Sequence, residues 1–310
     1  MFLRSAGLPR RGLLAGAAGL ALLRAARAGE GRPVVVASKS DTEGALTGSM
    51  IALCLEDLGI PVERRLGLGP TLIVRTALLA GEIDVYPEYT GNGAFFTGTE
   101  SDPVWKEAAG AYETIRRADA ARGLVWLPRA PANNTWLIAV RGSLARRENL
   151  VSMADFAGAV HRGLIRLAAS TEFVESPAAL PSFEAAYGFA MPFDRIVSLP
   201  GGDTAVTARA AAQGISGVNA GMVYGTDGAL DALDLAVMTD PKGAQIVYEV
   251  APVARQAVIG RYPAIPGKLG PVFAGLDAAT LRRLNARITV DGEVAEAVAR
   301  RFLRENGQIG

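Results

Sequence analysis

Alternation of short apolar segments with helix-like segments is the feature that most constrains the fold of this 310-residue chain. Residues 34–37 read Val-Val-Val-Ala, a continuously apolar strand of the kind found in sheets that are covered on both faces. The pattern then predicts a helix over 40–59, a strand over 60–66, a helix over 71–80 and a strand over 83–86. This order predicts a parallel sheet whose connections are right-handed.

The first predicted helix carries its own start and stop signals. Ser40 and Glu43 have the spacing of a capping box, in which each side chain bonds the other residue's backbone N–H. Gly59 is expected to end the helix, because glycine readily adopts the left-handed conformation of a C-cap. The apolar stripe that would face the core consists of Leu46, Met50, Cys54, Leu55 and Leu58.

Residues 81–93 form the segment best suited to a ligand, and they read GEIDVYPEYTGNG. Pro87 is expected to end the strand before it, since proline cannot donate a ladder hydrogen bond. The glycine-rich turn at 88–93 would then lie at the carboxyl end of a strand, where open α/β sheets bind ligands. Two interpretations stay open here: Tyr89 lines a pocket, or it covers the core beside a tight turn.

The chain divides into two lobes. A break rich in proline and asparagine at 128–134 separates two regions that follow the same pattern, and Ser152 and Asp155 cap a helix in the second region. A return connection follows Thr239. We therefore expect one lobe from residues 33–133 and 241–310, and a second lobe from residues 134–240. Within the first lobe, helices over 269–303 would pack back on the earlier elements. The further elements expected in the second lobe are strands over 136–140, 164–169, 195–199, 221–224 and 235–238 and helices over 180–187 and 204–213.

The first 28 residues have the composition of an export signal. They contain five arginines and no acidic residue, and residues 12–23 hold only Gly, Ala and Leu. That run is too short to span a bilayer, and residues 26–28 offer the small side chains that a signal peptidase reads. The pair Arg10 and Arg11 indicates a twin-arginine signal, with an ordinary secretory signal as the alternative. We expect cleavage after Ala28 and a periplasmic protein.

Charge and cysteine content narrow the possible partners. The whole chain has 32 Lys and Arg against 31 Asp and Glu, so removing five arginines leaves 27 basic residues and a net charge near −4. This balance argues against nucleic acid or an anionic membrane surface as a partner. Cys54 is the sole cysteine, so no intramolecular disulfide is possible, and we expect a soluble protein without membrane insertion.

The residue inventory gives little support to catalysis or metal binding. His161 is the sole histidine, it falls in a polar loop pattern, and no Gly-x-Ser-x-Gly elbow accompanies it. One Cys and one His cannot supply a transition-metal site. Residues 91–96 begin like a dinucleotide fingerprint but place Phe96 where the third glycine belongs. We therefore predict no catalytic residue, no metal and no cofactor.

Four aromatic residues stand out because aromatic residues make up only 6% of the chain and these four fall at strand ends or in loops. Facing one cleft, such rings would form an electron-rich box for a cation that cannot donate hydrogen bonds. Each ring taken alone fits a core better than a ligand wall, because aromatic residues mostly serve cores, and spacing alone does not bring the four together. The four are Tyr89, Trp136, Tyr224 and Tyr248.

Nine segments carry a resemblance that covers nearly the whole chain after the signal, with Ile-Asp-Val-Tyr-Pro-Glu-Tyr-Thr-Gly as the most specific string. They are residues 37–43, 55–59, 81–91, 133–136, 172–173, 224–227, Tyr248 with Pro252, 284–285 and 298–303. In these segments the chain resembles the substrate-binding proteins of osmoprotectant ABC importers, which take up glycine betaine, choline and related compounds. The resemblance implies a type II periplasmic binding fold: two lobes with parallel-rich sheets flanked by helices, joined by two crossovers around a hinged cleft.

The resemblance also implies site residues and partners. The family's cage of aromatic rings falls on the four aromatic residues just listed, and its polar contact falls on Asn134. Lys39 matches a Ser-Lys element whose ammonium can reach a ligand carboxylate, although a solvated lysine near a helix start is the alternative. Thr90 and Asn92 of the glycine-rich turn complete the predicted site. The implied partners are a small quaternary ammonium ligand and the permease subunits of an importer, and we expect a monomer.

Two departures from the family pattern affect the expected ligand. Ser176 stands where relatives often have an arginine, and Gly44 where some have glutamine. Arginine would clamp a carboxylate with two hydrogen bonds, which serine cannot replace. Choline, or another cation without a carboxylate, is therefore an alternative to betaine. A binding lobe that feeds a sensor is an alternative function, while a secreted enzyme is poorly supported.

Overall fold

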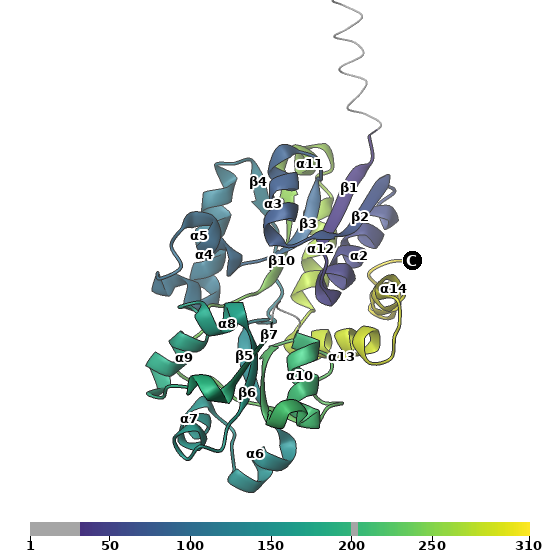
Figure 1. The fold of residues 1–310 in the computed structure, drawn as a ribbon. Coiled ribbons are helices and arrows are strands. Elements are labelled where there is room, and N and C mark those ends of the chain that lie inside the picture. The colour runs from purple at the N-terminus through teal and green to yellow at the C-terminus, as the bar shows by residue number, and fades with distance from the viewer. Residues whose placement is uncertain (1–31, 200–203) are drawn as a thin grey trace, which may run out of the picture.

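The computed structural model describes residues 32–199 and 204–310, and these form two lobes (Figure 1). Each lobe is built on a five-stranded sheet, with order β2-β1-β3-β10-β4 in the first lobe and β7-β6-β8-β5-β9 in the second. The expected export signal lies outside the described residues. Helices flank both sheets, so the expected two-lobed α/β architecture is confirmed.

The first sheet is mixed and not purely parallel. Strand β1 runs parallel to β2 and β3, as the strand–helix alternation predicts. Strand β10 is antiparallel to β3 and to β4, because it enters the sheet from the other lobe. The prediction of a parallel sheet therefore fails for the returning strand. The strands of this sheet are β1 (Val34–Lys39), β2 (Val62–Gly69), β3 (Val85–Tyr89), β4 (Leu124–Trp126) and β10 (Val250–Arg255).

The second sheet repeats this arrangement. Strand β6 is parallel to β7 and β8, whereas β5 is antiparallel to β8 and β9. The chain passes between the sheets from β4 to β5 and again from β9 to β10. Both expected lobe breaks fall in these two connections, and we retain 33–133 with 241–310, and 134–240, as proposed lobe limits. The strands are β5 (Trp136–Arg141), β6 (Leu167–Ser170), β7 (Ile196–Leu199), β8 (Ala220–Tyr224) and β9 (Leu235–Val237).

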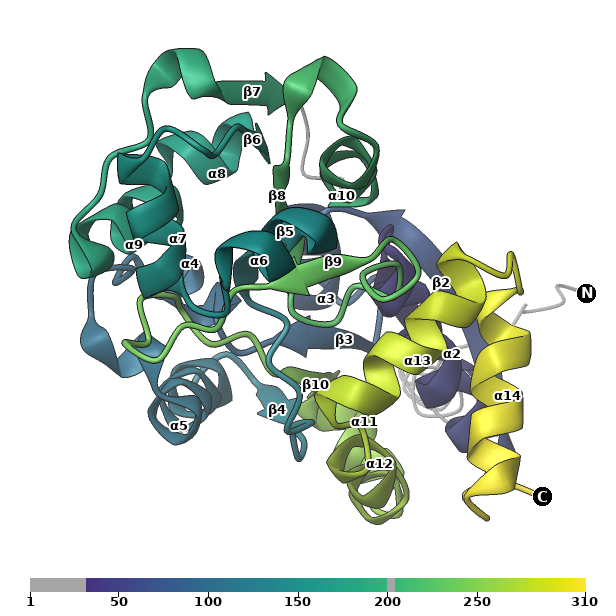
Figure 2. The same ribbon diagram turned by 90° about the horizontal axis from the view of Figure 1, so that it is seen from below.

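The helices cover the sheets, and those at the C-terminus return to the first lobe. Helices α12, α13 and α14 all contact α2, as expected for the tail, and Figure 2 shows α13 and α14 beside α2. Ser152 and Asp155 form the predicted capping box of α7. The helices around the first sheet are α2 (Thr42–Asp57), α3 (Thr71–Ala80), α4 (Asn92–Thr97), η1 (Pro103–Lys106), α5 (Ala108–Ala120), α11 (Gln256–Arg261), α12 (Ile265–Ala274), α13 (Ala278–Thr289) and α14 (Ala295–Glu305). Those of the second lobe are α6 (Gly142–Glu148), α7 (Met153–His161), α8 (Thr171–Glu175), α9 (Leu180–Tyr187), η2 (Phe193–Arg195), α10 (Thr204–Gln213) and η3 (Ile215–Gly217).

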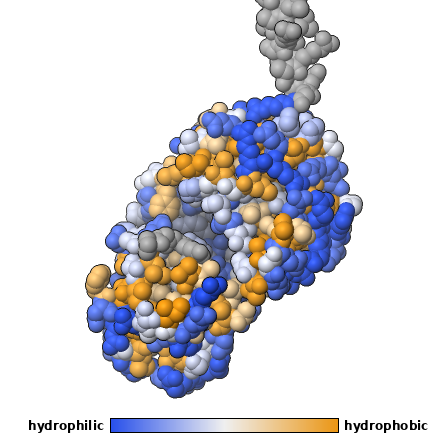
Figure 3. Space-filling model, turned by 45° about the vertical axis from the view of Figure 1, so that its right-hand side comes forward, coloured by the Kyte–Doolittle hydropathy of each residue, from blue (hydrophilic) through white to orange (hydrophobic). Residues whose placement is uncertain are grey.

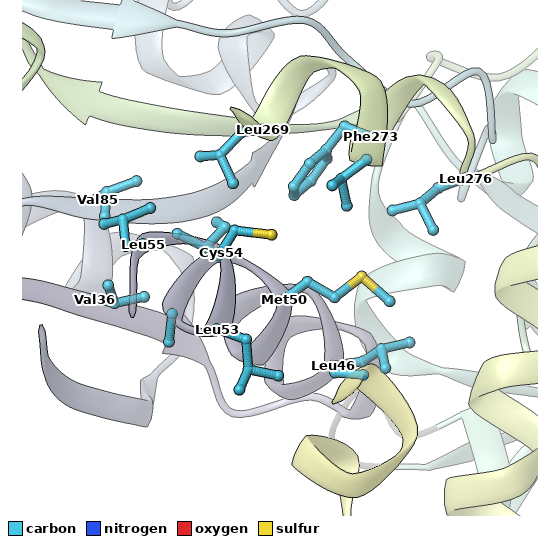
Figure 4. Close-up of a cluster of buried hydrophobic side chains, with 14 of the residues drawn as sticks. Val36, Leu46, Met50, Leu53, Cys54, Leu55, Val85, Leu269, Phe273 and Leu276 are labelled. Atoms are coloured by element: carbon cyan, nitrogen blue, oxygen red, sulfur yellow. The ribbon is translucent and has the colours of Figure 1, made fainter. Parts of the chain in front are cut away.

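Helix α2 is the centre of one of the hydrophobic clusters of the first lobe. Its apolar side chains lie between the sheet and α12, where Val36, Val85, Leu269 and Phe273 surround them (Figure 4). Four members of the predicted stripe are fully buried, but Leu58 is the C-cap and is 36% exposed. The helix is buried on several sides because α12, α13 and α14 cover the face that the sheet leaves open.

Two local predictions for segments beside the cleft between the lobes are wrong. Helix α2 is capped by Asp41, which accepts a hydrogen bond from the backbone N of Gly44 at 2.7 Å, so Ser40 and Glu43 do not form a capping box. Strand β3 also continues through Pro87, which lies opposite Pro252. Pro87 and Pro252 form a non-hydrogen-bonded pair of the antiparallel ladder, so the nitrogen of Pro87 points away from β10. On the other side, β1 pairs with β3 only at Val85. Proline at position 87 therefore costs no ladder hydrogen bond.

Candidate ligand-binding cleft

A cleft of about 840 Å³ separates the two lobes. Figure 3 shows the hollow between the upper and lower halves of the molecule. Both lobes and α13 contribute to its walls. The predicted site residues that line it are Lys39, Tyr89, Asn92, Asn134, Trp136, Tyr224 and Tyr248.

The four predicted aromatic residues meet at this cleft because strand pairing brings their segments together. Trp136, the first residue of β5, lies opposite Tyr224, the last residue of β8. Tyr89 ends β3 opposite Val250, two residues after Tyr248. The ring centroids of Trp136 and Tyr248 are 6.3 Å apart with an interplanar angle of 57°. The four residues therefore line one cleft, although they come from both lobes and both crossovers.

Two neighbours fix the orientation of these rings. Phe173, fully buried on α8, meets Trp136 edge-on with ring centroids 6.0 Å apart. Gly91 lies so close to Tyr248 that an added Cβ would be 2.7 Å from its Cδ1 atom. The glycine-rich turn thus packs against the ring of Tyr248. Glycine is needed at position 91 because the ring is so close, and not because of a positive φ.

The Lys39 ammonium is already neutralised inside the protein. It forms an ion pair with Glu88 and lies 4.7 Å from the ring centroid of Tyr89. Glu88 also accepts hydrogen bonds at 2.7 Å from the Tyr86 hydroxyl and from Nδ2 of Asn92. Lys39 and Asn92 border the cleft, but their polar ends are turned toward Glu88. In this arrangement the Lys39 ammonium is therefore not free to contact a ligand carboxylate, as the resemblance implied it would.

Glu43 is the central polar residue of the cleft, and the sequence reasoning assigned it only to a cap. It is 4% exposed, and its carboxylate accepts four hydrogen bonds. The donors are the Tyr89 hydroxyl at 2.8 Å, Asn134 Nδ2 at 3.4 Å, Thr226 Oγ1 at 2.5 Å and Asn285 Nδ2 at 2.8 Å. Burial raises the pKa of Glu43 to about 7, while the hydrogen bonds partly oppose this rise.

Asn285 on α13 is a second cleft residue that the site prediction did not include. Its Nδ2 also donates to the backbone carbonyl of Thr226 at 2.9 Å, so it links the C-terminal helix to the second lobe. Glu43 and Asn285 both lie in segments that carry the family resemblance, and this was the sequence signal that could have identified them. Glu43 was instead explained as part of a helix cap, and Asn285 lies in the interior of a predicted helix.

Three residues considered from the sequence do not line the cleft. Thr90 is fully buried, where its hydroxyl donates to the Val247 carbonyl at 3.1 Å and accepts from the Glu249 backbone N at 3.1 Å. In this arrangement Thr90 joins the turn to the second crossover, and its predicted contact with a ligand stays a prediction. Ser176 and Gly44 are likewise absent from the lining of the cleft.

The charges around the cleft favour a cation. Among the described lining residues, the carboxylates are Asp41, Glu43, Glu172 and Asp227, whereas Lys39 is the one basic side chain. Burial also raises the pKa of the Tyr224 hydroxyl to about 12, so this ring stays neutral at physiological pH. The described residues contain no group of three or more His, Cys, Asp or Glu side chains arranged for a metal ion.

Two mixed sheets, two crossovers and a cleft lined from both sides define the class: this is a two-lobed binding protein of the type II periplasmic kind. Residues 32–305 match the family model described as the substrate binding domain of the ABC-type glycine betaine transport system. The chain belongs to this family. Its members are substrate-binding proteins and not enzymes; they bind small ligands, work with permease components, and are periplasmic or extracellular.

Similar proteins agree with this assignment. The chain is 51% identical over 277 residues to the glycine betaine-binding protein YehZ of Escherichia coli, covering 89% of this chain and 91% of that protein. It is 31% identical to a glycine-betaine-binding protein of Pseudomonas aeruginosa, covering 89% and 90%. It is 29% identical to the ergothioneine transport permease/binding protein EgtU of Helicobacter pylori, over 90% of this chain and 48% of that one.

Solved structures give the same fold. Apo YehZ from E. coli matches with a TM-score of 0.77 at 51% identity, over 90% of this chain and 100% of that chain. A glycine betaine/carnitine/choline ABC transporter structure matches with a TM-score of 0.78 at 20% identity, over 89% and 99%. Among the described residues, no helix is both long enough and apolar enough to cross a membrane.

Proposed function

We propose that this protein is the solute-binding component of an ABC importer and captures a quaternary ammonium compatible solute in an aromatic cage. The cage consists of Tyr89, Trp136, Tyr224 and Tyr248. The observation that carries the proposal is the convergence of these four rings on one cleft whose lining is acidic. A permanently methylated ammonium donates no N–H hydrogen bond, so π faces and nearby carboxylates are the groups suited to hold it.

The rings supply enough attraction for useful affinity. A desolvated cation over an aromatic ring gains about 2 kcal/mol. Micromolar binding requires about 8 kcal/mol, which several ring contacts and burial of the methyl groups together can reach. Movement of the lobes about the two crossovers would enclose the ligand and present a closed surface to the permease.

Glycine betaine is the first candidate ligand because the E. coli and P. aeruginosa relatives are named for binding it. Choline is the alternative, and the charges of the cleft favour it. No arginine lines the described part of the cleft, and the one lysine is paired with Glu88. A ligand carboxylate would therefore lie near four protein carboxylates without a free cationic partner. The H. pylori relative, named for ergothioneine, adds another ligand to test.

The same proposal covers export and assembly. Residues 1–28 would be a twin-arginine signal that is cleaved after Ala28, which would release the protein into the periplasm. The mature protein would act as a soluble monomer, without insertion into the membrane, and deliver its ligand to the permease subunits of the importer.

Calorimetric titration with glycine betaine, choline, carnitine, proline betaine and ergothioneine tests the proposal. At least one should bind, and Trp136→Ala or Tyr89→Ala should weaken that binding by well over tenfold, because each removes a face of the cage. Unmodified amino acids should not compete. Binding of amino acids without binding of any methylated ammonium would overturn the proposed ligand class.

A further inference from the structure

Glu43 lies where four separate parts of the chain meet. Tyr89 comes from the first lobe, Asn134 from the first crossover, Thr226 from the second lobe and Asn285 from α13, and each donates to its carboxylate. Two of these donors, Tyr89 and Asn134, are predicted ligand contacts. One buried carboxylate therefore contacts both the predicted ligand wall and the second lobe.

The loop that carries Thr226 is held firmly against this junction. Its backbone N donates to Asn134 Oδ1 at 3.3 Å, and Arg282 Nε of α13 donates to the Gly225 carbonyl at 2.7 Å. Gly228 packs directly on α13, since an added Cβ would lie 2.1 Å from the backbone N of Ala286. A change at Glu43 would thus be transmitted to a fixed part of the second lobe.

Within the described part of the chain, none of the hydrogen-bond donors to Glu43 is a cation. The four donors are two hydroxyls and two amides, which are neutral. Asp41 on the same helix repels its charge, and Asp227 follows Thr226 in the second lobe. Lys39, the one basic side chain among the described lining residues, is paired with Glu88, and Arg282 bonds the Gly225 carbonyl. Ionised Glu43 is therefore a buried anion without a matched positive charge, which is a costly arrangement.

We propose that Glu43 is a positioning residue that holds Tyr89 and Asn134 for the ligand, ties them to Thr226, and provides the counter-charge for a cationic headgroup. This inference rests on the proposed function. A cation that enters the cage favours ionised Glu43, so the carboxyl O–H bond breaks and its proton passes to the solvent. When Glu43 is protonated, the hydroxyl of Tyr89 or Thr226 must turn from donor to acceptor, which loosens the junction.

The proton released should be measurable near neutrality. Because burial places the pKa of Glu43 at about 7, both forms are populated there. A ligand that prefers the ionised form lowers this pKa on binding. Its affinity should then fall by up to about tenfold per pH unit below 7, and it should be nearly constant above 8. Choline should show the larger pH dependence of affinity, since the carboxylate of glycine betaine repels ionised Glu43 and so opposes the attraction of its ammonium.

Titration of the mature protein with choline and glycine betaine, in buffers of different ionisation enthalpy from pH 5 to 8, tests the proposal. Wild type should release a fraction of a proton at pH 7 and show the pH-dependent Kd. Glu43→Gln should bind more weakly with a flat profile and no proton release. Glu43→Asp should keep the pH dependence but bind more weakly, because the shorter side chain cannot reach all four donors. Glu249→Gln removes another buried carboxylate outside the cleft, and it should keep the wild-type profile.

The outcomes separate the two proposals. If wild type binds no methylated ammonium, the proposed function fails and this inference fails with it. If wild type binds but releases no proton, or if Glu43→Gln keeps the wild-type pH profile, the role of Glu43 is wrong while the proposed function stands. Should Glu43→Gln fail to fold, the wild-type proton release and the Glu43→Asp profile decide the question.

Discussion

The rings of Trp136 and Tyr248 lie 6.3 Å apart although they belong to different crossovers between the lobes. Trp136 begins the strand that enters the second lobe, and Tyr248 precedes the strand that returns to the first. Under the proposed function, rotation of the lobes about these crossovers would change the relation between the two rings, and so would couple the geometry of the proposed cage to lobe closure.

Gly91→Ala should weaken ligand binding by about tenfold or more while it leaves the fold intact. The new methyl group would be 2.7 Å from Tyr248 Cδ1 and 2.8 Å from Ile246 Cγ2, so the ring must shift. Calorimetry with the best ligand of the panel measures the effect. Gly260→Ala is the matched control, since its Cβ would have no neighbour within 4 Å. Equal affinity of both variants would show that the position of Tyr248 does not matter.

Lys39→Met should destabilise the protein by about 3–5 kcal/mol, because it leaves Glu88 buried without its cation. Urea unfolding measures the change. The double variant Lys39→Met/Glu88→Gln should recover part of the loss, as expected for a coupled pair. A stable single variant with a selective loss of betaine affinity would instead support a direct contact between Lys39 and the ligand carboxylate.

The unfolding free energy should depend on pH through Glu43. Its folded pKa of about 7 lies above its ordinary value of 4.5, so the contribution is favourable below pH 4.5 and is lost as pH rises to 7. Relative to Glu43→Gln, wild type should lose about 3 kcal/mol across this window and change little above pH 8. Urea unfolding of both proteins at intervals of one pH unit gives the difference. Parallel curves would mean that Glu43 ionises normally.

Ser176→Arg should leave the order of ligand affinities unchanged, because Ser176 does not line the cleft. Competition calorimetry with betaine and choline tests this. A shift toward carboxylated ligands would mean that lobe closure brings residue 176 to the ligand.

The local elements could be predicted because their signals are local. Helices α3, α9 and α10 have the expected bounds, and Gly81 and Gly188 adopt the left-handed conformation that ends the first two.

The direction of β10 and the passage of β3 through Pro87 could not be predicted, since both depend on a partner strand more than 150 residues away. Glu43 was missed for a related reason: its spacing from Ser40 offered a sufficient local explanation, whereas its partners Thr226 and Asn285 are distant in sequence. The four rings could be singled out by their positions at strand ends or in loops, but only the family resemblance placed them in one site, and strand pairing explains why their segments meet.

Comparison of choline with its uncharged isostere 3,3-dimethyl-1-butanol tests the cage most directly, because the two molecules share shape and differ in the charge of one atom. If π faces and carboxylates hold a cation, choline should bind at least a hundredfold more tightly, equivalent to about 2.7 kcal/mol. Equal affinities, or tighter binding of the alcohol, would show that the cleft selects shape and apolar surface and would contradict the account.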